Sequence, residues 1–127
     1  MSSQDLEQIY RDFVSRILIA RRVWSVSCCG EIVAVHGGPR ICVPLFPDRA
    51  SARYFTTRYW PDLQPVSLSL RELIETHLPF FTDARVPVGL GIAPLENAIA
   101  LSPERLRKDL IAAQAGEGTP SLPALDA

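Results

Sequence analysis

Apolar side chains recur at helical spacing near the start of the chain. The stripe consists of Leu6, Ile9, Phe13 and Ile17, three or four residues apart. Such spacing places apolar side chains on one face of an α-helix, which can then pack against a core. The pattern predicts an amphipathic helix over residues 4–21.

Short alternating segments follow this helix. Residues 23–29 alternate apolar and small polar side chains, the pattern of a half-buried antiparallel strand. Turn sequences at 29–31 and 36–39 separate this segment from two further ones, at 31–35 and 40–45. We therefore predict a three-stranded meander.

A proline-rich corner precedes the second predicted helix. Pro44 lacks an amide donor and ends a strand ladder, and the fixed φ of Pro47 suits a first helical turn. Asp48 supplies an acceptor for the free amides there. The sequence predicts a helix over residues 48–59 with Ala52, Phe55 and Tyr59 on its buried side.

A third helix begins at a capping box. Ser69 and Glu72 stand three residues apart, so that each side chain can satisfy the other's backbone amide. Residues 64–68 before them form a short extended piece. The buried side consists of Leu70, Leu73, Ile74 and Leu78, and Pro79 interrupts the helix.

The last predicted elements are a strand pair and a helix. Residues 86–93 alternate regularly and pair with residues 97–101 across a turn. Gly89 and Gly91 leave one face bare, which we expect a large side chain, Trp24 or Trp60, to cover.

Ser102 and Pro103 suit the N-cap and first position of the last helix, which buries Leu106, Leu110 and Ile111. Together these elements predict one α+β domain over residues 1–115, with an antiparallel sheet and about four helices mainly on one face. Residues 116–127 are rich in small residues and predict a disordered tail.

Composition restricts the classes of function. The formal net charge of −1 gives no reason to expect nucleic-acid binding. No apolar run approaches the 18 or more residues of a membrane span, and the acidic, polar start does not resemble a signal peptide. We therefore expect a cytoplasmic protein with no membrane contact.

Several of these features together resemble one known family. They are Val23-Trp24, Pro44-Leu45-Phe46-Pro47 with Ala52, Trp60, the Ser69 helix, and Ser102-Pro103-Glu104-Arg105-Leu106 through Asp109-Leu110. Across about residues 10–111 their order and spacing are similar to the bacterial family called domain of unknown function 2750. Phe46 stands where that family usually has Trp. The resemblance implies a fold and carries no catalytic or binding residue with it.

The candidates for chemistry are few. Cys28, Cys29 and Cys42, with His36 and His77, are ligand types for zinc, but adjacent cysteines on a strand point to opposite faces and no C-x-x-C occurs. We therefore expect buried, reduced cysteines and neither a metal nor a cofactor. The alternative is a small cysteine-dependent enzyme or thiol sensor.

The candidate binding surface is on the second helix. Arg49, Arg53, Tyr59 and Trp60 are residue types that anchor protein interfaces, and Tyr54 and Arg58 share the helix with them. The same types also border ordinary cores. The sequence favours a non-catalytic binding or protein-interaction module over an enzyme, with an unknown protein partner, and leaves open whether the protein is a monomer or a homodimer.

Overall fold

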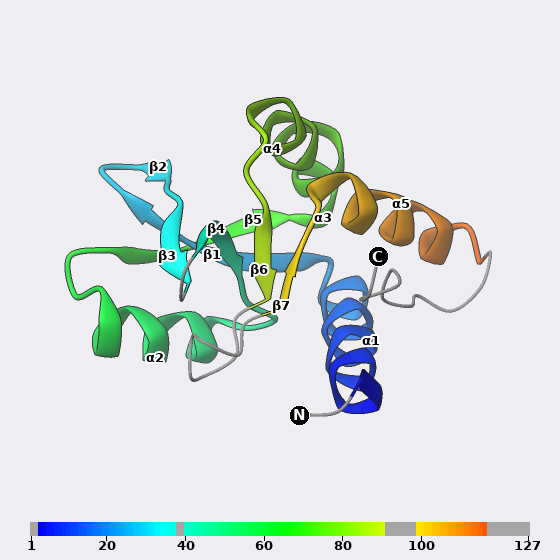
Figure 1. Cartoon of the computed structure of the whole chain (residues 1–127), viewed down its shortest axis with the longest axis horizontal. Coiled ribbons are helices and arrows are strands. Elements are labelled where there is room, and N and C mark those ends of the chain that lie inside the picture. Colours follow the sequence, from blue (N-terminus) through cyan, green and yellow to red (C-terminus); the bar gives the residue numbers. More distant parts are fainter. Residues whose placement is uncertain (1–2, 38–39, 91–98, 117–127) are drawn as a thin grey trace.

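The computed structural model of the chain describes residues 3–37, 40–90 and 99–116 (Figure 1). The elements are α1 (Ser3–Ala20), β1 (Arg22–Cys28), β2 (Glu31–Ile32), β3 (Val35–Gly37), β4 (Arg40–Leu45), α2 (Arg49–Tyr59), β5 (Gln64–Ser69), α3 (Leu70–Glu72), the π-helix η1 (Leu73–His77), α4 (Leu78–Ala84), β6 (Val88–Leu90), β7 (Ile99–Leu101) and α5 (Pro103–Gln114). The α+β class is confirmed. Gly91 and most of the predicted tail lie outside the described residues.

Two small sheets form the centre of the fold. One has the order β2-β1-β5 and the other β3-β4-β6-β7. Backbone hydrogen bonds join them, since the amide of Trp24 donates to the carbonyl of Phe46 at 2.9 Å and the amide of Phe46 donates back at 2.7 Å.

The predicted middle strand of the meander is divided. Residues 31–32 pair with β1, whereas residues 35–37 pair with β4 in the other sheet. The amide of Val33 still bonds the carbonyl of Val26, so the chain leaves β1 after residue 33 and crosses to β4. The pairing order of the meander is kept, but its strands belong to two sheets.

One strand pair departs from the antiparallel expectation. β4 and β6 run parallel, with Pro44 opposite Gly89. Two strands joined by a short turn are antiparallel, but the chain between β4 and β6 contains α2, β5 and the helical segment α3–η1–α4, a connection long enough for a parallel pair. β6 and β7 pair antiparallel as predicted.

The helices divide between two hydrophobic cores. The larger core joins α1, the α3–η1–α4 segment and α5 to both sheets, and the smaller consists of Val26, Val35, Phe46, Ala52 and Phe55. α2 covers the smaller core, and Figure 1 shows it on the opposite side of the molecule from α5. Its outward face is therefore separate from the main helical layer.

The caps formed largely as predicted. The carboxylate of Asp48 accepts from the amide of Ser51 at 2.7 Å, and Ser69 and Glu72 form the capping box. Pro47 precedes the N-cap and so is not the first helical residue, a correction to the prediction. Pro79 does not end its helix, because the π-helix before it widens the turn where an α-helix would clash with the proline ring.

Three core predictions were wrong. Tyr59, expected on the buried side of α2, is 38% exposed. A Cβ built on Gly89 would lie 2.7 Å from the sulfur of Cys42, so a small side chain from the neighbouring strand covers this glycine and not a tryptophan. Ile111 is 41% exposed because it lies off the buried stripe of Leu106 and Leu110.

Candidate functional site

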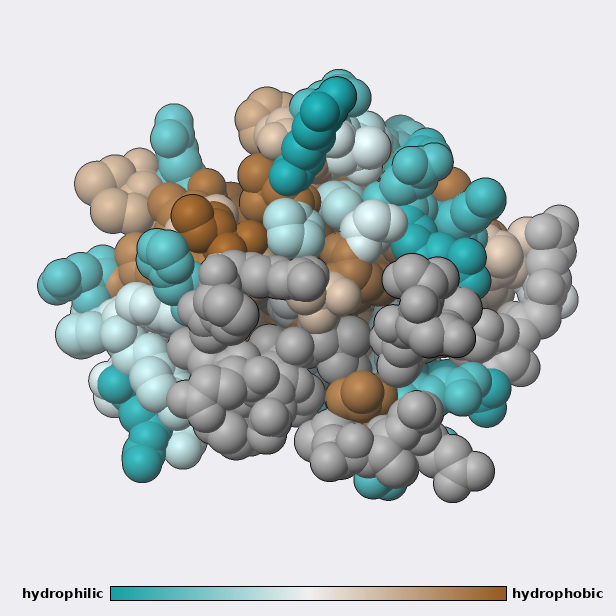
Figure 2. Space-filling view, viewed as in Figure 1, coloured by the Kyte–Doolittle hydropathy of each residue, from teal (hydrophilic) through white to brown (hydrophobic). Residues whose placement is uncertain are grey.

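The outward face of α2 is basic. Arg49, Arg53 and Arg58 are exposed, and the helix contains no acidic residue. Its opposite side buries Ala52 and Phe55 against the smaller core. In Figure 2 the surface over α2, at the lower left, is hydrophilic, as expected for a face turned away from that core.

Aromatic rings hold two of these arginines. The guanidinium carbon of Arg49 lies 6.0 Å from the ring centroid of Trp24, and that of Arg58 lies 5.7 Å from the ring of Tyr54. Both distances are within the range of cation–π contact. The rings orient the guanidinium groups without neutralising their charge.

Among the described residues, salt bridges form only at arginines outside α2, and Arg21, Arg22, Arg85 and Arg107 have none either. Within the described residues, four salt bridges are formed, Arg11–Glu7, Arg16–Asp48, Arg71–Glu75 and Arg105–Asp109, and none of them involves an arginine of α2. The three positive charges of α2 therefore face solvent without an ionic partner among those residues.

Arg53 lies in a shallow depression of the same face. Ala50, Arg53, Tyr54, Thr57 and Arg58 line this depression, whose volume is about 550 Å³. Tyr54 is 51% exposed, so its ring is available to a bound molecule as well as to Arg58. The depression combines cationic donors with an aromatic wall.

Tyr59 and Trp60 are grouped at the end of the helix. Their rings lie 6.1 Å apart, and both pack against Phe55, at 5.1 Å and 4.8 Å. Trp60 belongs to the border of the smaller core. Arg49 begins the helix ten residues before Tyr59, about 15 Å along its axis. The structure thus places Arg49 and Arg53 on the basic face, the exposed Tyr59 at the end of the helix, and Trp60 against the smaller core.

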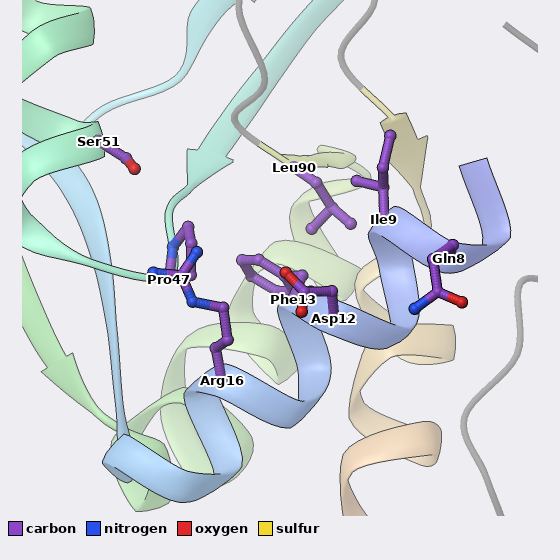
Figure 3. Close-up of a pocket in the computed structure, with 8 residues that line it drawn as sticks. All are labelled: Gln8, Ile9, Asp12, Phe13, Arg16, Pro47, Ser51 and Leu90. Atoms are coloured by element: carbon purple, nitrogen blue, oxygen red, sulfur yellow. The ribbon is translucent and has the colours of Figure 1, made fainter. Parts of the chain in front are cut away.

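A separate pocket lies between α1 and the start of α2 (Figure 3). Its volume is about 440 Å³, and its walls are formed by Gln8, Ile9, Asp12, Phe13, Arg16, Pro47, Ser51 and Leu90. In Figure 3 the side chain of Arg16 extends toward Pro47.

The charges around this pocket largely satisfy one another. Arg16 donates to Asp48 at 2.5 Å, and Asp48 also caps α2. Burial acts to raise the pKa of Asp48, but the hydrogen bonds from Ser51 and Arg16 outweigh it and lower that pKa. Asp48 thus already binds both the amide at the N-terminus of α2 and the guanidinium of Arg16, the two groups that an anionic ligand would use.

All three cysteines were predicted to be buried, but only one of them is. Cys42 is buried, and burial raises the pKa of its thiol, whereas Cys28 and Cys29 are exposed. The sulfurs of Cys28 and Cys29 lie 3.8 Å apart. The expectation that adjacent cysteines point to opposite faces of a strand was wrong, because Cys29 lies in the turn after β1, at φ 57°.

The two histidines belong to other elements than these thiols. His36 is in β3, and His77 stacks on Phe81 with ring centroids 6.2 Å apart. In the part of the chain that the structure describes, no group of three or more His, Cys, Asp or Glu side chains could hold a metal ion.

Comparison with known proteins identifies the family. Residues 10–110 match the family described as protein of unknown function, DUF2750. The chain belongs to the DUF2750 family. The match covers the described elements from the first half of α1 into α5, including α2 and the β1–β2 hairpin. No curated protein sequence matches the chain significantly.

Membership of DUF2750 assigns no activity, so function has to be argued from the side chains. Sequence reasoning found the arginines and aromatic residues of α2. It missed the contact of Arg49 with Trp24, which is 25 residues earlier and on a strand, because no local pattern links the two. Among the described residues, no helix is both long and apolar enough to cross a membrane.

Proposed function

We propose that this chain is a small, non-catalytic cytoplasmic module that binds a partner protein through the outward face of α2. The partner would present an acidic surface. Arg49, Arg53 and Arg58 would supply charge and hydrogen-bond donors, and Tyr54 and Tyr59 would supply rigid apolar contact area.

The observation that supports this proposal is that α2 has three exposed arginines, no acidic residue, and no ionic partner for these arginines among the described residues. A guanidinium group that already pairs with a carboxylate must lose that contact before it binds another. Cation–π contacts instead hold Arg49 and Arg58 in place while leaving donor groups free. Ordering these long side chains beforehand lowers the entropy cost of binding.

Cys42 does not support a cysteine-dependent enzyme. It is 4% exposed, and burial raises the pKa of its thiol, so the thiolate form is disfavoured. A nucleophilic cysteine requires the opposite environment, with access to substrate and a lowered pKa.

A charge reversal tests the proposal. The Arg53→Glu variant should fold with nearly unchanged stability, because a surface substitution usually costs within about 0.5 kcal/mol. In affinity capture from the source lysate with mass spectrometry, this variant should lose a specific protein that the original chain retains, since repulsion replaces attraction at the contact. Lys108→Glu is the matched control, because it makes the same charge change on the exposed side of α5.

Two results contradict the proposal. One is equal recovery of every captured protein with the Arg53→Glu and Lys108→Glu variants. The other is binding of the purified chain to duplex DNA that is lost specifically with Arg53→Glu, which would assign the same face to nucleic acid.

A further inference from the structure

The β1–β2 hairpin turns through two residues. Cys28 pairs with Glu31, so Cys29 and Gly30 form the loop, with φ values of 57° and 85°. Positive φ at both loop positions matches the twist of hairpin strands. The turn places two consecutive exposed thiols at the end of the hairpin.

The spacing of the thiols matches a metal ion. Two thiolates bound at 2.3 Å to one tetrahedral zinc ion lie about 3.8 Å apart. The sulfurs of Cys28 and Cys29 lie 3.8 Å apart. Both side chains are exposed, so an ion can reach them from solvent.

The same pair is poorly arranged to form a disulfide with itself. Consecutive Cα atoms across a trans peptide lie about 3.8 Å apart, whereas disulfide-bonded cysteines have Cα atoms about 4.4–6.8 Å apart. Closing the bond would distort the tight turn. Holding an ion between the two sulfurs requires no such change.

We propose that Cys28 and Cys29 form a two-sulfur site for a soft divalent metal ion of the zinc and cadmium type. Binding deprotonates both thiols, forms two metal–sulfur bonds and releases two protons, with no change of oxidation state. Water, or the same turn of a second chain, fills the remaining two positions of the tetrahedron. The expectation of a metal-free protein was based on buried cysteines, a premise that does not hold for this pair.

Cadmium titration of the purified full chain tests this site. Cd²⁺ should produce saturable thiolate-to-metal absorption in the ultraviolet and release two protons per chain in weakly buffered solution. Cys29→Asn should abolish saturation at equimolar cadmium while keeping the turn, because Asn tolerates positive φ. Cys28→Ser should do the same, whereas Cys42→Ala should leave the absorption intact.

The stoichiometry identifies the other ligands. One ion per chain with unchanged mass means that water completes the site, and one ion per two chains with doubled mass means that a second turn does. Either result supports the two-sulfur site. Equal absorption from the original chain and from both the Cys29→Asn and Cys28→Ser variants would overturn it.

Discussion

Gly89→Ala tests the packing between the two central parallel strands. Gly89 is buried in β6, and an added methyl group would meet the sulfur of Cys42 on β4 at 2.7 Å. No real Cβ approaches a neighbour so closely, so the thiol has to move within a packed sheet. Overpacking of this kind costs about 1–3 kcal/mol, offset by about 0.4–1 kcal/mol from the stiffer unfolded chain.

Removing the sulfur should relieve the clash. Cys42→Ala alone should cost about 1 kcal/mol, as for other losses of one buried methyl-sized group. In the double variant the new methyl occupies the vacated space, since the Cβ of Cys42 is 3.5 Å away and in ordinary contact. The double variant should therefore be more stable than the sum of the single changes predicts, by about 1.5 kcal/mol or more.

Urea denaturation at 25 °C, followed by tryptophan fluorescence, measures all four proteins. The slopes of unfolding free energy against urea should agree, so that midpoints report stability. If the two changes add within about 0.5 kcal/mol, Gly89 does not face Cys42 and the pairing of β4 with β6 is wrong.

Three further changes probe other contacts. Asp48→Ala should lower the free energy of unfolding by about 0.5–2 kcal/mol at pH 7, because the cap of α2 is lost. The pKa of Asp48 is lowered in the folded state, so this contribution is present above the ordinary pKa of 3.8 and disappears as the pH falls through the lower folded value. Denaturation of both proteins across pH 2–7 should therefore show the difference in stability shrinking in acid. Cys29→Asn should stabilise the hairpin by up to about 1 kcal/mol, because Asn adopts positive φ more readily than Cys, and a lower melting temperature would contradict this turn geometry. Tyr10→Phe should lower the free energy of unfolding by about 1.5–3 kcal/mol in the same urea assay, because the hydroxyl of this fully buried side chain donates to Asp109 at 2.6 Å. A loss below about 0.5 kcal/mol would mean that this bond is not formed.

Local patterns predicted the helices and their caps because those features depend on residues a few positions apart. The stripe of α1 and the capping box of Ser69 with Glu72 are examples, and both formed as expected. Long-range pairing had no comparable signal. β4 and β6 are parallel, and Gly89 packs against Cys42, because a connection of about forty residues returns the chain to this place. The alternation of apolar and polar residues within each strand does not specify the path of that connection.

The candidate surfaces were only partly predictable for the same reason. Residue types within α2 identified a basic, aromatic helix, but the contact of Arg49 with Trp24 required the fold. At the hairpin, the rule that neighbouring strand residues face opposite sides separated Cys28 from Cys29. The positive φ of Cys29 brought the sulfurs together, and a Cys-Gly pair between two predicted strands was the one local signal for it.

The most direct test of the proposed function is to map where a captured partner binds. Backbone amide signals of the ¹⁵N-labelled chain, recorded by NMR with and without the purified partner, report this residue by residue. We predict that the largest shifts occur over α2, at Arg49, Arg53, Tyr54 and Arg58, and that α5 is unaffected. Shifts confined to the pocket beside α1, or to the β1–β2 hairpin, with α2 unchanged would contradict the proposal.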